Sequence, residues 1–394
     1  MPVAELLLLS PDHRVSVQFA LGEWSAGGRK WPGTPLWQVS LAGNPILRAS
    51  RLGAVLDGVP LAHGLAVAGV KRHRIRREWH PETGDAAVRY DHANELVVRL
   101  RPAGPDAPHF DLALRCGDGA VAVQVRVPRQ RGVRRTPPPA LNAVARFPEH
   151  AEAWRETNAG FGPAPFDEAA LPPDAPLLLN YPHGKLACIR PRPAVVASQS
   201  HTFEGVGLGR APDRTPWQVV LVADRPADLP ERMRSLPNLG LPAERQAASD
   251  DAVANCVAPF LGALPTVSGA VPPTPAHRQA FAVVAGAGEA RWDETRFLRG
   301  EIGEYVVAAR RRGGVWQVGA ITGAEGRVIT VRLEDLAEAD RPCSLDVGRD
   351  PLPGEAADAD GVLRETLAPV YTDEAPRIEM PPGGGFVLRL TPST

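Results

Sequence analysis

The stretch "RGEIGEYVVAARRRGGVWQVGAIT", residues 299 to 322, predicts two β-strands joined by a tight turn. An apolar, β-branched run, Val306 to Ala308, leads into the turn, and a second run, Val315 to Ala320, leads out of it. The turn is Gly313-Gly314, a pair that adopts the backbone angles of a two-residue hairpin loop at little steric cost. A hairpin this late in the chain favours a β-domain at its C-terminal end.

Strand patterns continue on the C-terminal side of this hairpin. From Trp292 onward the sequence is β-rich, with further candidate strands in "GRVITVRLEDL", "PCSLDVGRD" and "GGGFVLRLTP". The acidic run at 354–361, "GEAADADG", only loosely matches the spacing of a calcium loop, and it is typical of a solvated loop. We therefore expect a small C-terminal β-sandwich at residues 292–394.

Residues 10 to 127 carry the same signature on a larger scale. Five segments have strand length and are rich in apolar or β-branched residues: "RVSVQFAL", "LWQVSLAG", "ELVVRLRP", "FDLALRCG" and "AVAVQVRV". In the third, Leu96, Val98 and Leu100 alternate and so share one face. Turn residues such as Asp57-Gly58 separate the segments. This pattern predicts an antiparallel sandwich.

The middle of the chain is less regular. We expect Pro-rich loops with a short strand at Val144–Phe147, then a hairpin in "PLLLNYPHGKLACI" and a closing strand in "PWQVVLVAD". Residues 275 to 288 have near-helical spacing, whereas Pro and Gly interrupt the segment before them. The predicted fold is mostly β, with an N-terminal domain at 1–231 and an irregular, partly helical linker at 232–291.

The bulk composition excludes several classes of function. The chain has 44 Lys and Arg against 45 Asp and Glu, so no overall field attracts a polyanion. Two short basic runs, Lys71–Arg77 and Arg129–Arg135, are typical of solvated strand ends or loops, and we expect no nucleic-acid partner. No stretch approaches the ~20 apolar residues of a membrane span. The first 14 residues lack the features of a signal peptide, so we expect a cytoplasmic protein unless the start is misplaced.

The four cysteines give no sign of a metal or redox motif. They are far apart in sequence and form no CxxC pair, which argues against a zinc knuckle or a thioredoxin-like site. Buried free thiols are favoured over disulfides.

The order of these segments resembles glycoside hydrolase family 97, which includes α-glucosidases and α-galactosidases. In that family an N-terminal β-supersandwich precedes a catalytic (β/α)8 barrel, and a small C-terminal β-sandwich follows. The C-terminal resemblance is carried by "WDETRFLRGEIGEYVVAARRRGGVWQVGAIT" and "PPGGGFVLRL". The N-terminal resemblance is carried by "SPDHRVSV", "SRLGAVLDGVPL", "YDHANELVVRLR" and "TPWQVVLVADRPADLPE". It implies an N-terminal β-supersandwich at residues 1–231.

The resemblance also implies that the barrel is largely missing. A (β/α)8 barrel takes roughly 250 residues, whereas about 60 residues lie between residue 231 and Trp292. The segment "LPNLG" resembles the exit from the N-terminal domain, and "TPAHRQAFAVVAG" resembles a late barrel helix. The paired carboxylates of the family's chemistry lie on the barrel and have no counterpart here.

The family's calcium site is expected to be lost as well. One Glu ligand of that site comes from the N-terminal domain after a hairpin, and the matching segment here is "GKLACIRPRPAVV". Arg190, Pro191 and Arg192 stand where that Glu would be, and no acid occurs between residues 177 and 203. Guanidinium groups do not ligate calcium, so we expect no metal and no cofactor.

A polar phrase at the start of one strand is the first candidate for sugar contact. Asp91, His92, Asn94 and Glu95 match a phrase similar to "DHYNEL" in the family, and the resemblance implies that they face the former sugar cleft. The alternative is ordinary hydrogen bonding at a turn and a strand edge.

Three tryptophans, Trp31, Trp37 and Trp79, are the aromatic candidates. An exposed ring can stack on a sugar face, since the apolar C–H surface of the sugar matches a flat π system. The alternative is that the rings are buried in the core.

The expected function is a non-catalytic, carbohydrate-binding protein or pseudoenzyme with an oligosaccharide ligand. One alternative is a glycoside hydrolase acting on α-glucosides or α-galactosides with acids recruited from the loops between residues 146 and 174. Another is a decayed remnant without a selected role. Because loss of the barrel would expose apolar faces, we expect the two sandwiches to pack on each other or the protein to form a homodimer.

Overall fold

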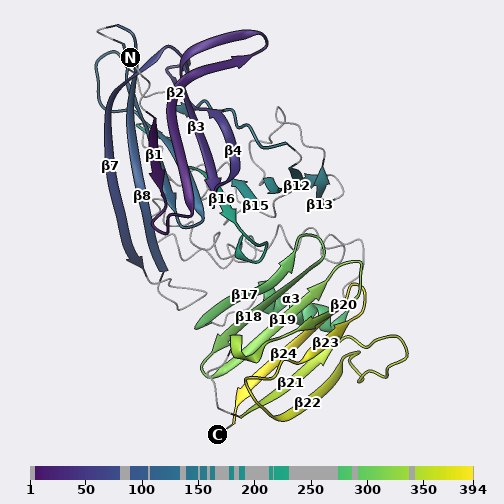
Figure 1. Ribbon diagram of the computed structural model, residues 1–394. Coiled ribbons are helices and arrows are strands. Elements are labelled where there is room, and N and C mark those ends of the chain that lie inside the picture. The colour runs from purple at the N-terminus through teal and green to yellow at the C-terminus, as the bar shows by residue number, and fades with distance from the viewer. Residues whose placement is uncertain are drawn as a thin grey trace.

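The computed structural model describes residues 5–79, 89–104, 107–133, 139–149, 151–157, 160–164, 177–181, 186–190, 213–215, 217–229, 274–285, 292–336 and 342–393. These residues form two β-rich regions that follow one another along the chain (Figure 1). The mostly β fold predicted from the sequence is confirmed.

The N-terminal region consists of facing antiparallel sheets. A four-stranded sheet has the order β1-β2-β3-β4, a nine-stranded sheet has the order β13-β12-β14-β15-β16-β10-β9-β8-β7, and a small sheet has the order β11-β5-β6. The strands are β1 (Leu6–Leu9), β2 (Val15–Ala26), β3 (Arg29–Leu41), β4 (Asn44–Arg51), β5 (Ala54–Leu56), β6 (Val59–Leu61), β7 (Leu65–Trp79), β8 (Arg89–Pro102), β9 (Phe110–Gly117), β10 (Ala120–Arg126), β11 (Ala140–Leu141), β12 (Glu152–Thr157), β13 (Gly160–Ala164), β14 (Leu177–Asn180), β15 (Leu186–Arg190) and β16 (Gln218–Ala223).

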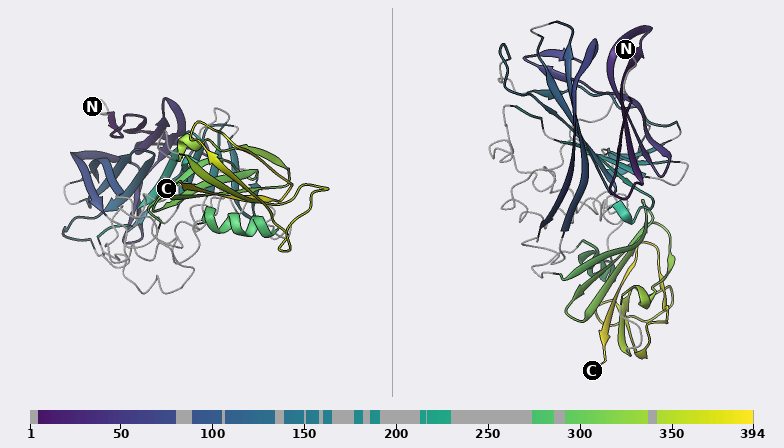
Figure 2. Two further views of the ribbon diagram at one scale, coloured as in Figure 1. Left: turned by 90° about the horizontal axis from the view of Figure 1, so that it is seen from below. Right: turned by 60° about the vertical axis from the view of Figure 1, so that its left-hand side comes forward.

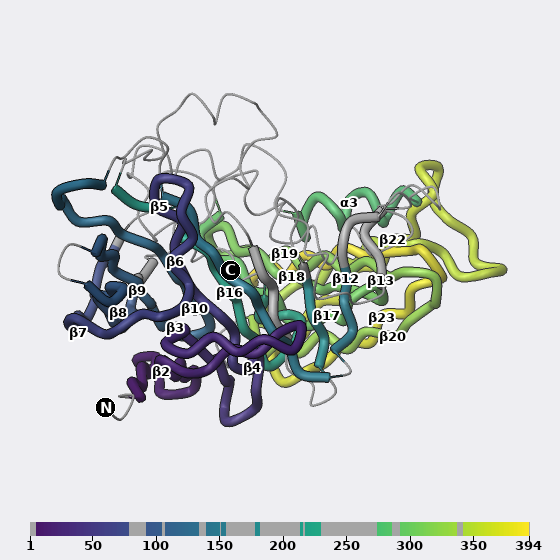
Figure 3. The backbone as a smooth tube through the Cα atoms, turned by 90° about the horizontal axis from the view of Figure 1, so that it is seen from above, coloured from purple at the N-terminus to yellow at the C-terminus, as the bar shows by residue number. Residues whose placement is uncertain are grey.

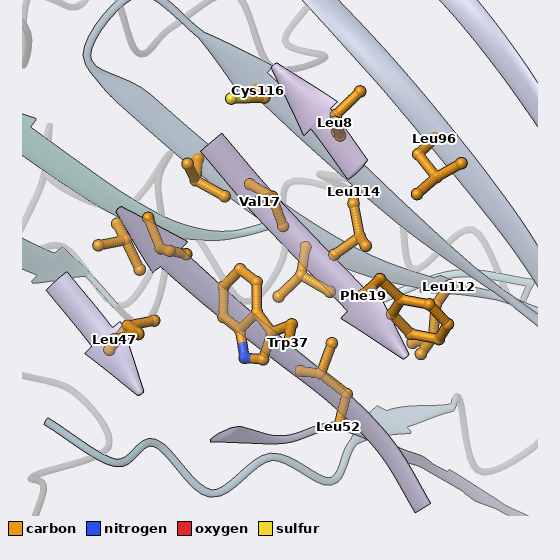
Figure 4. Packing of buried hydrophobic residues seen from close by; sticks show 14 of the residues in the cluster. Leu8, Val17, Phe19, Trp37, Leu47, Leu52, Leu96, Leu112, Leu114 and Cys116 are labelled. Carbon is orange, nitrogen blue, oxygen red and sulfur yellow. The ribbon is translucent and has the colours of Figure 1, made fainter. Parts of the chain in front are cut away.

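The core of this region lies between the four-stranded and nine-stranded sheets. Leu96, Leu112 and Leu114 of the larger sheet are fully buried there, together with Val17 and Phe19 of the smaller sheet (Figure 4). Leu96 is one of the residues whose alternation predicted a buried face. Burying side chains of this size removes most of their apolar surface from water, at about 1.5–3 kcal/mol each.

The opposite face of the nine-stranded sheet is also apolar at its centre. Val97, Ala113 and Val219, which alternate with the core residues along their strands, belong to a second buried cluster. That cluster also contains Val306 and Ile321 of the C-terminal region. The two regions therefore share buried apolar contacts, as expected from the loss of a barrel between them.

The C-terminal region is a smaller sandwich. A six-stranded sheet has the order β17-β18-β19-β24-β21-β22, and β20 pairs with β23. Its core is a third cluster, which includes Val318, Phe386 and Leu388 from the large sheet and Ile378 from the small one. Its strands are β17 (Glu294–Glu301), β18 (Tyr305–Arg312), β19 (Val315–Thr322), β20 (Arg327–Thr330), β21 (Cys343–Arg349), β22 (Leu363–Val370), β23 (Arg377–Met380) and β24 (Gly385–Pro392), with a short 3-10 helix η7 (Leu333–Asp335).

The hairpin predicted from residues 299–322 is confirmed. Strand β18 pairs with β19 in continuous antiparallel register, from Tyr305 opposite Thr322 to Arg312 opposite Val315. Gly313 has a φ of +59°, a conformation that side chains other than Gly rarely adopt. Its amide donates to a carboxylate oxygen of Asp293 at 2.6 Å, which ties the turn to the start of β17.

Helix α3 (Pro275–Ala285) lies along the outer face of the six-stranded sheet (Figure 2), where the sequence predicted a helix. Two glycines of the sheet make this close approach possible. A Cβ at Gly319 would lie 2.6 Å from the backbone oxygen of Ala280, and one at Gly385 would lie 2.9 Å from the Cα of His277. The helix and the sheet are therefore in backbone contact at these positions.

Buried charges hold both ends of α3. At the N-terminal end, the Asp350 carboxylate, 2% exposed, accepts hydrogen bonds from the Thr274 hydroxyl at 2.5 Å and the Ala276 amide at 3.2 Å. At the C-terminal end, the buried Arg310 guanidinium donates to the backbone oxygens of Val283 and Val284. An anion at the start of a helix and a cation at its end both stabilise the helix dipole, and they satisfy backbone groups that have no partner within the helix.

One predicted strand is wrong. Residues Val144–Phe147 run along β4, but only Val144 forms a bridge, with Arg51. The reason is Ser50, whose hydroxyl accepts the Arg146 amide at 2.9 Å in place of a backbone carbonyl and so interrupts the ladder.

Two further expectations have partial answers. Cys116 and Cys343 are buried free thiols, and burial raises the pKa of both.

The domain boundaries at 231 and 292 stay predictions, because most of residues 230–291 lie outside the described residues. In the part of the chain that the structure describes, no helix has the length and apolarity needed to cross a membrane.

We call the pair of buried charges at the two ends of α3, Asp350 and Arg310, the clamp, and a substitution of Asp350 tests it. The Gly385 amide also donates a hydrogen bond to the Asp350 carboxylate, at 2.7 Å. Asp350→Ala therefore removes the buried acceptor of this amide and of the start of the helix. We expect a loss of about 2–4 kcal/mol in the free energy of unfolding, measured by urea denaturation of the full chain. The matched control, Asp373→Ala in an exposed turn, should change the free energy of unfolding by less than about 0.5 kcal/mol. Equal effects of the two substitutions would contradict the clamp.

Candidate functional site

The four polar candidates all lie on β8, but the strand separates them. The Asn94 amide donates to the backbone oxygen of Leu9 at 2.8 Å, toward the four-stranded sheet. Glu95, the next residue, bonds to side chains on the opposite face. His92 is exposed, and the side chain of Asp91 lies outside the described region. The structure therefore does not gather these four residues at one point.

The three aromatic candidates lie on different elements. Trp31 is half-buried on β3, opposite Trp24 in the β2–β3 pairing. Trp37 is 5% exposed and belongs to the core cluster, where Figure 4 shows its ring among aliphatic side chains. Trp79 is the last residue of β7, opposite Arg89, and its side chain is outside the described region.

Glu95 is the centre of a compact polar group, which we call the arginine–tryptophan cluster: Glu95, Arg115, Arg126 and Trp217. One Glu95 oxygen, Oε2, accepts from Arg115 Nε at 2.8 Å and from Arg126 Nη2 at 3.1 Å. The other, Oε1, accepts from Arg126 Nη1 at 3.2 Å. The guanidinium carbons of Arg115 and Arg126 lie 4.7 and 5.4 Å from the centre of the Trp217 ring. The cluster thus combines ion pairs with cation–π contacts.

Four neighbouring chain segments position this cluster. Glu95 on β8 lies directly opposite Arg115 on β9 in the antiparallel register, so their side chains project from the same face. Arg126 ends the next strand, β10, where its Nε donates to the Gln124 side chain at 2.8 Å. Gln124 in turn donates to the backbone oxygen of Thr215 at 2.8 Å, which places the segment carrying Trp217.

The electrostatics keep Glu95 ionised. Burial by itself raises the pKa of this carboxyl, but the hydrogen bonds and charges of Arg126 and Arg115 outweigh burial and lower the pKa below its ordinary value of 4.5. With one carboxylate and two guanidinium groups, the cluster carries a net positive charge. The Nη1 atom of Arg115 is buried and has no hydrogen-bond acceptor among the described residues. The chemistry of this group suits an added oxygen acceptor, such as a hydroxyl or an anion.

No metal site is evident in the described ranges. They contain no group of three or more His, Cys, Asp or Glu side chains placed to hold an ion. Arg190, at the position implied for the family's calcium ligand, ends β15 opposite Val219. Pro191 and Arg192 lie outside the described residues. The loss of the calcium site therefore stays a prediction.

Sequence reasoning missed Arg115, Arg126 and Trp217. The available signal was an arginine inside each of two apolar strands, "FDLALRCG" and "AVAVQVRV". A buried cation needs a partner, and Glu95 is the acid on the adjoining strand. The pairing itself depends on the strand order, which the sequence does not state.

Models of known families match the chain near both of its ends. Residues 8–164 match the model described as "Glycosyl-hydrolase 97 N-terminal", and residues 291–391 match "Glycosyl-hydrolase 97 C-terminal, oligomerisation". Similar curated proteins are a "Retaining alpha-galactosidase" of Bacteroides thetaiotaomicron, 35% identical over 99 residues, and a "Probable retaining alpha-galactosidase" of Streptomyces bingchenggensis, 29% identical over 119 residues. These matches cover 25% and 30% of this chain but only 14% and 18% of the relatives.

Solved structures agree on the fold. A glycoside hydrolase family 97 enzyme in complex with acarbose, from Pseudoalteromonas sp. strain K8, has a TM-score of 0.67 at 10% identity over 99% of this chain and 100% of that one. A beta-arabinopyranosidase has a TM-score of 0.64 at 13% identity over 98% of this chain and 100% of that one. Identities this low establish the shared fold alone.

The lowered pKa of Glu95 leads to the second prediction. An acid whose folded-state pKa is depressed stabilises the fold above its unfolded-state pKa, and this contribution is lost as pH falls through the folded-state pKa. Glu95→Gln removes the titration, so the variant should unfold at lower urea than the wild type at neutral pH. The difference should shrink as the pH falls below about 4.5.

Urea midpoints measured from about pH 7 to about pH 3 provide the check. The control is Glu379→Gln, an exposed acid on β23, which should track the wild type throughout. A stability difference for Glu95→Gln that does not change with pH would show that Glu95 acts by packing rather than by charge.

Proposed function

Because the chain belongs to glycosyl-hydrolase family 97 through its N-terminal and C-terminal domains, while the barrel is absent from the 394 residues, we propose that it is a non-catalytic, carbohydrate-binding member of that family. The observation that carries this proposal is the order of the parts. Strands β14 to β16 still belong to the nine-stranded sheet, and α3 already packs on the C-terminal sheet. Fewer than 50 residues separate Leu229 from Thr274, against roughly 250 for a barrel.

The chemistry of glycoside hydrolysis supports the non-catalytic part. It requires two carboxyl groups about 5–10 Å apart, one of which must hold a proton at the working pH. Glu95 has a lowered pKa and is bound by two arginines, so it is unsuited to donate a proton. Of the acids between residues 146 and 174, Glu149 pairs with Arg48 at 3.1 Å, and Glu152 is exposed on β12. Asp167 and Glu168 lie outside the described residues.

The carbohydrate-binding part rests on relatives and on position. Two similar proteins are named as retaining α-galactosidases, one of them as probable, and a different protein of similar fold is in complex with acarbose. In this chain the pairing register brings the end of β7 and the start of β8 together, with Arg77 opposite Asp91 and Arg76 opposite His92. Trp79 follows two residues after Arg77. We propose that this end of the hairpin contacts a neutral, α-linked oligosaccharide, with Trp31 on β3 as a further aromatic candidate.

Two assays test the proposal. We expect calorimetric titration with α-linked galacto- and gluco-oligosaccharides to give saturable binding, and aryl α-galactoside and α-glucoside to be released no faster than in buffer, with or without calcium. His92→Ala should weaken the binding several-fold, while His63→Ala, a similarly exposed histidine, should not.

The non-catalytic role and the carbohydrate binding can be contradicted by different results. Turnover that a chelator abolishes would contradict the non-catalytic role and favour a hydrolase with recruited acids. Absence of binding across the panel would favour a remnant that retains only its fold.

We also propose that the protein forms a homodimer through its C-terminal domain, for which the matching family description, "oligomerisation", is the support. The edge strand β22 is exposed from Arg364 to Pro369. Leu367, 40% exposed, is a large apolar side chain on that edge, and Tyr371 follows it. An apolar side chain on an edge strand favours association.

Light scattering should therefore give twice the chain mass of 42.1 kDa. Leu367→Glu should shift the protein toward the monomer, because it places a charge in the contact. Val328→Glu, a comparably exposed position on β20, should leave the dimer intact. A monomeric wild type, or equal effects of the two substitutions, would contradict the proposed contact.

A further inference from the structure

A strongly basic surface of the described residues lies along the strand β7, whose end forms the hairpin end discussed above. This strand forms one edge of the nine-stranded sheet, on the outer side of the N-terminal region (Figure 3). Its side chains are exposed at every position from 66 to 78 except Ile75, which is half-buried. We call its cationic residues the basic strip: Lys71, Arg72, Arg74, Arg76 and Arg77.

The basic strip has little internal neutralisation. No acid occurs in β7 before Glu78. Among the described side chains, Lys71, Arg74, Arg76 and Arg77 form no ion pair. Asp91 lies across from Arg77 at the end of the strip, and the one acid opposite its middle is Glu95, across from His73. Its carboxylate is already bound by Arg115 and Arg126. The strip therefore presents a local positive field although the whole chain is nearly neutral.

The strand geometry orders these charges. Successive residues rise by about 3.3 Å and alternate between the two faces of the sheet. Arg72, Arg74 and Arg76 thus follow one face at intervals of about 6.6 Å, with Lys71 and Arg77 on the other, over a length of about 20 Å. The Arg72 guanidinium is anchored by donating to the backbone oxygen of Leu7 at 2.8 Å. A row of evenly spaced cations complements a linear ligand whose anionic groups repeat evenly.

We propose that the basic strip binds an anionic polysaccharide, a linear chain of sugars bearing carboxylate or sulfate groups. Guanidinium groups bind such oxyanions with paired, charge-assisted hydrogen bonds. The inference rests on the proposed carbohydrate-binding role for the class of ligand, but it concerns a different sugar chemistry and a longer surface. Arg76 and Arg77 lie at the hairpin end proposed for the neutral ligand, and Lys71, Arg72 and Arg74 extend beyond it along β7. The neutral oligosaccharide contacts the hairpin end, whereas the anionic chain runs along the edge of the sheet.

Two other occupants fit less well. An added peptide strand would need the free backbone groups of the edge, and charged side chains along an edge oppose that kind of pairing. A nucleic acid would draw on a wider basic surface, since its affinity comes from neutralising many phosphates. The near-zero net charge of the chain does not supply that surface.

Direct binding measurements with defined probes test the proposal. Polygalacturonate supplies carboxylates, heparin supplies sulfates, dextran is the neutral control, and single-stranded poly-dT is the polyanion that is not a polysaccharide. We expect the full chain to bind polygalacturonate or heparin at about 50 mM salt, not to bind dextran, and to lose affinity steeply as salt rises. The charged polysaccharide that binds more tightly shows whether the strip prefers carboxylate or sulfate groups. Tighter binding of poly-dT than of either would overturn the proposal.

A matched pair of double variants distinguishes an effect of the basic strip from an effect of the net charge of the chain. Lys71→Gln with Arg74→Gln should weaken polysaccharide binding at least about tenfold and flatten its dependence on salt. Arg377→Gln with Arg389→Gln removes the same charge from exposed strand positions of the C-terminal region and should leave binding unchanged. Equal losses in both variants would overturn the proposal, provided that urea midpoints show both to be folded.

The two carbohydrate proposals can fail independently. Binding of neutral oligosaccharides without binding of anionic polysaccharides would overturn the role of the strip and leave the proposed function standing. Binding of anionic polysaccharides alone, lost in the Lys71 and Arg74 variant, would support the strip and contradict the neutral ligand.

Discussion

The joint between the two β-regions depends on two buried charges that hold one helix. Asp350 and Arg310 bind opposite ends of α3, and both are 2% exposed. Removing the helix would take from each charge the partners that the helix supplies, and a buried charge that loses its partners costs several kcal/mol. The helix itself is short and carries two glycine contacts, so it gains most of its stability from this packing. Ala280 and Val284 of this helix belong to the same apolar cluster as Val219 and Leu221 of the nine-stranded sheet.

The outer face of the nine-stranded sheet has the composition of an interface rather than of a solvated surface. An antiparallel sheet commonly turns one face to water and carries polar residues there. Here Val97, Ala113 and Leu221 lie on that face, and the charged side chains among them are paired within the sheet: Arg115 with Glu95, and Arg99 with Asp111. Such a surface is stable only when something covers it. In this chain, which carries no barrel, the C-terminal region shares the burial.

The sequence predicted those parts of the fold that local composition marks. The strand "FDLALRCG" was found from its strand length and apolar residues, and the hairpin around Gly313 from two apolar runs joined by a Gly-Gly turn. β7 was not recognised as a strand, because its side chains are exposed on both faces and residues Lys71 to Arg77 have the composition of a solvated charged segment. The arginine–tryptophan cluster was out of reach as well, because Glu95 and Trp217 meet only through the order of strands β16, β10, β9 and β8. Strand order depends on long-range pairing, which local periodicity does not encode.

The state of Glu95 connects the fold with the proposed loss of catalysis. A carboxyl group that serves as an acid catalyst must keep its proton near neutral pH, which requires an apolar pocket or a nearby negative charge to raise the pKa. Glu95 has the burial but also two guanidinium groups, and their effect prevails. Its oxygens accept three hydrogen bonds and have little surface left for a substrate. The same arginines that make Glu95 a good structural ion pair therefore make it a poor proton donor. A new active site on this sheet would first have to remove them, at the expense of the pairing that lets the face be buried.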